Sequence, residues 1–129
     1  MMKKVNCDLF GHGEYIMFNM QRLMEFEAAV GKPVSELLTM VQWPINCIIS
    51  GYAIGMKQYG RNPNKYMELI GELLEDEEEN LTLAAIQLPI TKALIASGVF
   101  GAQLYYQMFP NEMTDADKLA IESENNPKN

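Results

Sequence analysis

Side chains that could carry out chemistry are few in this chain of 129 residues, and they form no known catalytic set. His12 is the one histidine, and it lies between two glycines in an expected turn, where a solvated side chain is favoured over a catalytic base. Cys7 and Cys47 follow no CxxC pattern and cannot complete a zinc site with a single histidine, so we expect buried free thiols in a reducing cytosol. The sequence has no GxSxG, glycine-rich phosphate-loop or HExxH motif. It therefore predicts a protein that is not an enzyme and uses no metal or cofactor.

Acidic residues are the second group with chemical potential, and five of them are consecutive at 75–79. This run lacks the alternating spacing and the glycine of a calcium loop. A solvated segment, or a face for a basic partner, is therefore favoured over a metal site. Glu25 and Glu27 lie two residues apart on an expected helix, so they point to different faces and cannot share a proton.

Composition narrows the range of partners. The formal net charge of −7 argues against binding to nucleic acid or to anionic lipid, because both draw affinity from lysine and arginine. Ten methionines are many for this length. Methionine is flexible and polarizable, so it suits adaptable apolar contacts, although we expect most of these side chains to fill the core.

Residues 18–40 are the best-specified stretch. Asn19 is a good N-cap for a helix that places Met20, Leu23, Met24 and Val30 on one face. Gly31 is expected to end this helix in the left-handed conformation. Pro33 can then begin a second short helix over 34–40.

Two further helices are predicted before residue 80. Pro44 opens a helix over 45–59, which we expect to be buried at the centre and to end at Gly60. Gly51 and Gly55 would let another helix approach closely. Asn62 and Pro63 form a cap and a first helical position for residues 63–74. Apolar residues recur there at helical spacing, opposite three glutamates: Tyr66, Met67, Leu69, Ile70, Leu73 and Leu74.

Residues 80–109 are long and apolar, with Pro89 expected either to kink a helix or to start a new one. A holin-like membrane protein is a rival interpretation, because residues 93–109 and 41–56 carry no charge. Residues 41–56 are fewer than the ~20 residues that a bilayer requires, and polar residues and glycines interrupt both spans. We therefore expect core packing, with an exposed aromatic edge formed by Leu104, Tyr105, Tyr106, Met108 and Phe109.

The predicted fold is mainly α, a helical domain of about five helices preceded by an N-terminal β-hairpin over residues 3–18. The hairpin is marginal alone, so it should pack on the helix that follows or add to another subunit's strands. The domain is expected to span residues 1–110. Residues 111–129 are expected to form a short helix, capped by Thr114 and Asp117, and a disordered polar tail.

A resemblance joins these observations. Residues 23–38 read Leu-x-Glu-x-Glu-x-x-Val-Gly-x-Pro-x-Ser-Glu-Leu-Leu, after the β-like entry Gly-Glu-Tyr-Ile-Met-Phe at 13–18. This pattern resembles the small tail assembly chaperones of long-tailed bacteriophages, prophages and gene transfer agents. The resemblance covers roughly residues 8–60 and implies a protein of the bacterial host cytoplasm. Such a protein binds the tape measure protein and keeps it soluble until tail tube protein replaces it. A frameshifted longer form is also a family property.

The resemblance and the apolar helical faces together give candidate contact residues for the partner. We expect these to come from Met20, Leu23, Met24, Tyr52, Met56, Tyr105, Tyr106 and Met108, several of them being core. The alternative from another class is a self-associating structural protein of the virion, such as a head–tail connector or a minor tail component. Homo-oligomer formation stays open under both hypotheses.

Overall fold

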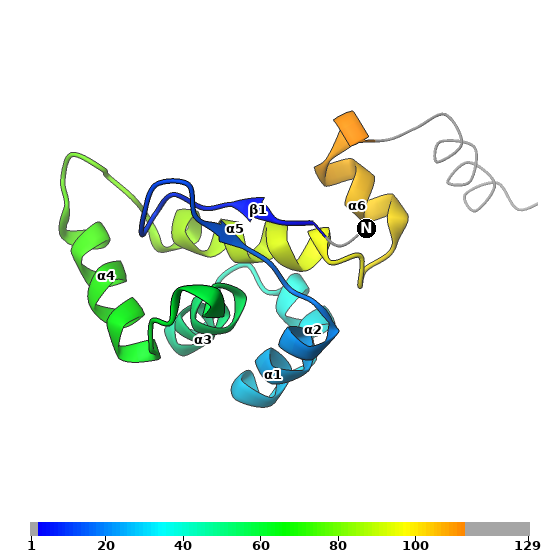
Figure 1. Cartoon of the computed structure of the whole chain (residues 1–129), viewed down its shortest axis with the longest axis horizontal. Helices are drawn as coiled ribbons and strands as arrows, with labels where there is room; N and C mark the ends of the chain where they lie inside the picture. Colours follow the sequence, from blue (N-terminus) through cyan, green and yellow to red (C-terminus); the bar gives the residue numbers. More distant parts are fainter. Residues whose placement is uncertain (1–2, 113–129) are drawn as a thin grey trace, which may run out of the picture.

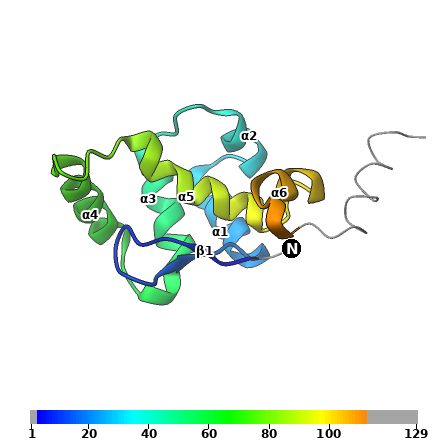
Figure 2. The same cartoon turned by 90° about the horizontal axis from the view of Figure 1, so that it is seen from above.

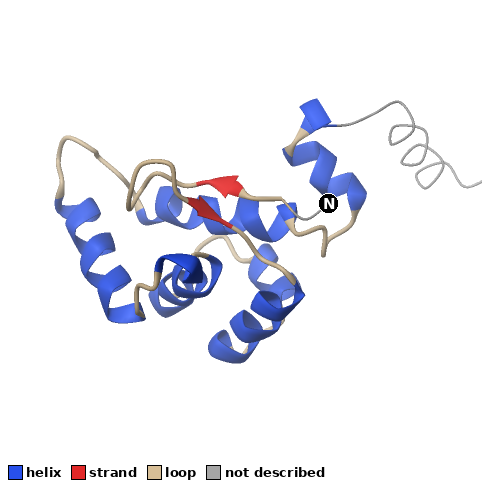
Figure 3. Ribbon diagram, viewed as in Figure 1, coloured by secondary structure: helices blue, strands red, loops and turns tan. Residues whose placement is uncertain are grey.

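The structure is a computed structural model that describes residues 3–112. Helix α3 (Ile45–Gly55) lies at the centre of this part of the chain. It packs against α1 (Met20–Val30), α4 (Pro63–Glu75) and α5 (Leu83–Ala96), as Figure 1 shows. The fold is mainly helical with an N-terminal two-stranded antiparallel hairpin, visible in Figure 3, so the predicted fold class is confirmed.

The predicted helix pair over 18–40 is also confirmed. The Asn19 side chain accepts a 2.9 Å hydrogen bond from the Arg22 backbone N–H, and this bond caps α1. Gly31 ends the helix at φ 72°, a conformation that glycine adopts without a Cβ penalty. Helix α2 (Val34–Thr39) follows at once. The Glu27 carboxylate accepts a 2.7 Å bond from the Val34 N–H, so the first helix helps to cap the second.

The hairpin is shorter than expected. Strands β1 (Val5–Asn6) and β2 (Tyr15–Ile16) pair antiparallel. Both strands contact α5, near the other end of the described chain. The end of the predicted hairpin also packs on the helix that follows, as expected, because the Phe18 ring lies 5.5 Å from that of Phe26 between centroids. The Met17 N–H donates to the Gly55 carbonyl at 3.0 Å, so α3 also holds the hairpin.

Helix α4 begins as predicted, with Asn62 accepting from the Lys65 N–H at 2.8 Å and Pro63 in the first turn. It ends at Glu75. The next carboxylate, Asp76, accepts from the backbone N–H groups of Glu78 and Glu79, so the acidic run forms a turn. The helix therefore stops where consecutive carboxylates would oppose its dipole.

Helix α5 continues through Pro89 without restarting. The proline ring lacks the N–H that would bond to the Ala85 carbonyl. Ala85 is exposed, so water can satisfy this carbonyl. Helix α6 (Ala102–Met108) and a 3-10 turn (Pro110–Glu112) complete the described chain. The expected C-terminal helix with its Thr114–Asp117 cap lies outside the described residues.

The core joins all of these elements. A Cβ on Gly51 would come within 2.8 Å of the Ile90 side chain on α5, so this glycine does permit the predicted close helix approach. Gly55 instead faces Ile16 and Phe18 of the hairpin. Both cysteines are buried free thiols, as predicted. No helix within residues 3–112 has the length and apolar character to cross a bilayer.

Candidate partner-binding surfaces

The eight candidate contact residues do not form one surface. Met20 and Met24 are 60% and 65% exposed. Leu23, Tyr52, Met56 and Tyr105 are buried, so these four lie in the core and are not accessible to a partner in this structure. Tyr106 is half-buried against that core, and Met108 is half-buried.

The expected exposed aromatic edge at 104–109 is wrong. Helix α6 turns back onto α5, so that Tyr105 is only 4% exposed. Phe109 packs against the core, and its ring contacts that of Tyr105 at 5.2 Å between centroids. Leu104, Tyr106, Met108 and Phe109 are half-buried and Tyr105 is buried, so this segment is largely covered rather than exposed.

Met20 and Met24 form, with the exposed Ala28, an apolar stripe along α1 that we call the methionine face. Spacing of four residues places these side chains one above another on the helix. Arg22 anchors the opposite flank, because its Nη1 donates to the Gly55 carbonyl at 3.0 Å and to the Gln58 Oε1 at 2.9 Å. The methionine face is thus held outward.

A second exposed apolar stripe lies on α4. Met67 is 54% exposed and Leu74 is 44% exposed, and Gly71 lies between them. A Cβ added to Gly71 would meet nothing within 4 Å. We call these three residues the α4 face. Met67 and Leu74 belong to the apolar set that recurs along this helix in the sequence, but of that set only Tyr66 and Ile70 are buried.

Carboxylates concentrate next to the α4 face. Residues 63–79 hold one lysine and seven acidic side chains, namely Glu68, Glu72, Glu75, Asp76, Glu77, Glu78 and Glu79. The rest of the described chain holds six acidic and seven basic side chains, so its charge is nearly balanced. The negative field of residues 3–112 therefore comes from this helix and its C-terminal turn.

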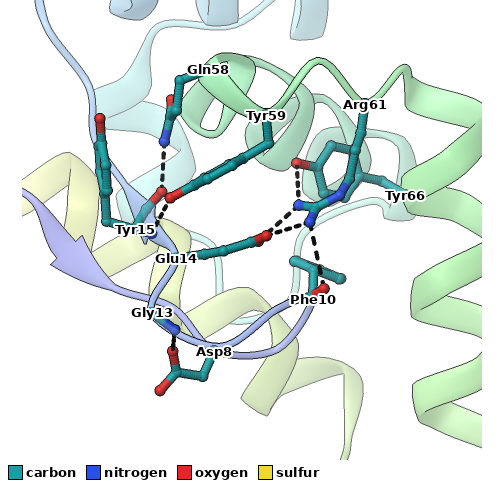
Figure 4. Close-up of polar contacts among 9 residues, drawn as sticks. All are labelled: Asp8, Phe10, Gly13, Glu14, Tyr15, Gln58, Tyr59, Arg61 and Tyr66. Atoms are coloured by element: carbon teal, nitrogen blue, oxygen red, sulfur yellow. Dashed lines mark hydrogen bonds and ion pairs between the residues drawn. The ribbon is translucent and has the colours of Figure 1, made fainter.

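A polar network fixes where α4 begins, as Figure 4 shows. Arg61 donates through Nη1 to Glu14 Oε1 at 2.8 Å and through Nη2 to the second carboxylate oxygen. Tyr15 of β2 is held through its backbone, because its N–H donates to the Tyr59 hydroxyl at 2.9 Å. The hydrogen bonds with Glu14 raise the pKa of Arg61, and burial raises the pKa of Tyr66 beside it. This network joins the hairpin to α4.

The groups considered for chemistry are not brought together. His12 is exposed at the hairpin turn. Burial raises the pKa of the Cys7 thiol to about 11 and also raises the pKa of Cys47. Within residues 3–112 no three histidine, cysteine or acidic side chains are placed to hold a metal ion, the run at 75–79 included.

Comparison with known proteins identifies no matching family model, no matching curated protein and no matching solved structure. The candidate surfaces for a partner are therefore the two exposed apolar stripes, the methionine face and the α4 face. Each has a helical spacing of apolar side chains and each lies on a helix that is fixed from its other side. Such stripes suit contact with a partner helix or an extended apolar segment.

Proposed function

We propose that this protein is a tail assembly chaperone that binds the tape measure protein and keeps it soluble during tail morphogenesis. The observation that carries the proposal is the methionine face. It lies within the residues that resemble the chaperone family, and it exposes more than half of both methionine side chains. Flexible thioether side chains can adapt to the varied apolar segments of a long partner.

Magnitudes indicate that the methionine face does not act alone. Fully burying one methionine stabilises by about 1.5–3 kcal/mol, so covering the exposed parts of two contributes about 2–4 kcal/mol. Micromolar binding requires about 8 kcal/mol net. A partner must therefore contact more of this surface than α1.

The test is sedimentation of the purified full chain with and without a fragment of a phage tape measure protein. We expect a soluble complex with the fragment. Replacing both methionines, Met20→Gln and Met24→Gln, should weaken this complex at least tenfold. The matched control is Val99→Gln, because Val99 is 43% exposed and belongs to the turn after α5 rather than to α1.

Two outcomes would overturn the proposal. One is a failure to form any complex with the fragment. The other is assembly of the chain alone into stable homo-rings that ignore the fragment, which would support a structural protein of the virion. Loss of binding in the Val99→Gln control as well would show that the methionine face is not the contact.

A further inference from the structure

We infer that the α4 face is a docking site for a basic amphipathic helix of a partner protein. The inference rests on the surface of α4 and does not require the tail chaperone assignment. It names a partner chemistry that the methionine face does not specify.

The α4 face has the form of a helix-docking surface. Met67, Gly71 and Leu74 have the spacing i, i+4, i+7, so they follow one stripe over two turns. The two apolar side chains leave an open position at Gly71, where an added Cβ has no neighbour within 4 Å. A side chain from a facing helix can enter this gap, as knobs do between packed helices.

The site is preformed and accessible. Tyr66 and Ile70, on the inner side of the same helix, are buried, and the Tyr66 ring stacks with that of Tyr52 on α3 at 6.0 Å between centroids. Arg61 holds the start of α4 to the hairpin. In the two views of Figures 1 and 2, α4 lies at one end of the molecule. A partner helix would therefore find an already ordered surface, which lowers the entropic cost of binding.

The carboxylates beside the α4 face indicate the kind of partner that would bind there. Glu68, Glu72 and Glu75 run along the outer side of the stripe, and the carboxylates of residues 76–79 extend it beyond the helix end. Glu68 has Lys65 within 3.9 Å on the same helix. Glu72 and Glu75 lie in the last turn, where their charges oppose the helix dipole and do not stabilise α4 itself. A partner helix with lysine or arginine beside its apolar stripe would neutralise them while covering Met67 and Leu74. A second copy of the same face would be repelled.

The experiment measures fluorescence anisotropy of a labelled synthetic 18-residue peptide added to the full chain. The peptide has leucine at helical spacing and lysine on both flanks. We expect binding that weakens at least tenfold when salt is raised from about 0.05 M to about 0.5 M, because screening shortens the range of the charges. Two comparison peptides should not bind: one has glutamate in place of lysine, and the other has glutamine in place of leucine.

Substitutions on α4 test whether the peptide binds at the α4 face. The pair Met67→Gln and Leu74→Gln should weaken peptide binding at least tenfold, whereas Leu88→Gln should not, although Leu88 is 45% exposed. The pair Glu72→Gln and Glu75→Gln should weaken binding at low salt, whereas Glu36→Gln on α2 should not. All of these side chains are exposed, and an unchanged circular dichroism spectrum would establish that each variant folds.

The inference is overturned if the lysine–leucine peptide does not bind, if the leucine-free peptide binds equally well, or if Leu88→Gln weakens binding as much as the α4 pair. Met20→Gln with Met24→Gln should leave peptide binding unchanged. If the peptide fails while the tape measure complex forms, this inference falls and the proposed function stands. If the peptide binds while no tape measure complex forms, the proposed function falls and this inference stands.

Discussion

The Arg61 guanidinium donates hydrogen bonds to both carboxylate oxygens of Glu14, although 47 positions separate the two residues in the chain. Their side chains are only 19% and 13% exposed. Arg61 also donates toward the Tyr66 hydroxyl at 3.3 Å. A two-point, charge-assisted contact of this kind fixes orientation as well as distance. It ties the hairpin to the helix that carries the α4 face.

Removing this carboxylate should therefore be costly. We expect Glu14→Ala to lower the free energy of unfolding by about 2–3 kcal/mol, because it leaves a largely buried guanidinium without its counter-charge. Urea denaturation followed by the fluorescence of Trp43, the single tryptophan, measures the change. Glu36→Ala breaks the exposed Lys32–Glu36 pair and should change stability by less than about 0.5 kcal/mol. Equal effects of the two substitutions would contradict this assignment.

Two helical glycines should respond to alanine in opposite directions. Gly71→Ala is expected to stabilise the fold by about 0.5–1 kcal/mol, since alanine restricts the unfolded chain and favours helix. The Cβ has open space there. Gly51→Ala is expected to destabilise by about 1–3 kcal/mol, since its Cβ would come within 2.8 Å of the Ile90 side chain. Thermal unfolding measures both, and a stabilising Gly51→Ala would show that α3 and α5 are not packed as described.

Gln87 should be needed as a hydrogen-bond acceptor. Its Oε1 accepts a 2.9 Å hydrogen bond from the buried backbone N–H of Trp43 and so holds the α2–α3 loop against α5. Gln87→Met keeps the length of the side chain and removes the acceptor. We expect a loss of about 1–3 kcal/mol, because a buried N–H is left without a partner. Circular dichroism is the suitable measurement, since the substitution lies beside the tryptophan. Gln103→Met, at an exposed position of α6, is the matched control and should have an effect within about 0.5 kcal/mol.

Alkaline pH should weaken the fold. Burial raises the pKa of Cys7 from 9.0 to about 11, so the unfolded chain loses this proton first. The stabilisation is present below pH 9 and is lost as the pH rises from 9 to 11, by on the order of 2–3 kcal/mol. Cys7→Ala should reduce the loss of stability between pH 9 and pH 10, whereas the raised pKa values of Tyr52 and Tyr66 should still weaken the fold above pH 10. Cys47→Ala should retain most of the loss between pH 9 and pH 10, and a curve unchanged by Cys7→Ala would show that another group is responsible.

The sequence by itself determined where the first four helices begin and, within one residue, where α1, α2 and α4 end. Helix α3 was expected to run to residue 59, but it ends at Gly55 and a 3-10 turn over Lys57–Tyr59 follows. Asn19, Gly31, Asn62 and Pro63 act through hydrogen bonds and backbone conformations within a few residues, so they could be interpreted without knowing the fold. Pro89 shows the limit of such local rules. It lies inside α5 because the surrounding packing outweighs one missing hydrogen bond.

The tertiary structure alone decided which apolar faces are covered. Leu23 and Met24 are neighbours in one amphipathic pattern, yet one is 6% exposed and the other is 65% exposed. Only Met20 and Met24 among the eight candidate contact residues are largely exposed, and the α4 face was not anticipated. Helical periodicity marks a stripe as apolar, whereas the neighbouring element that covers it is set by contacts between residues far apart in the chain. The sequence therefore determined the helices and the caps, and only the folded chain determined which surface is left for a partner.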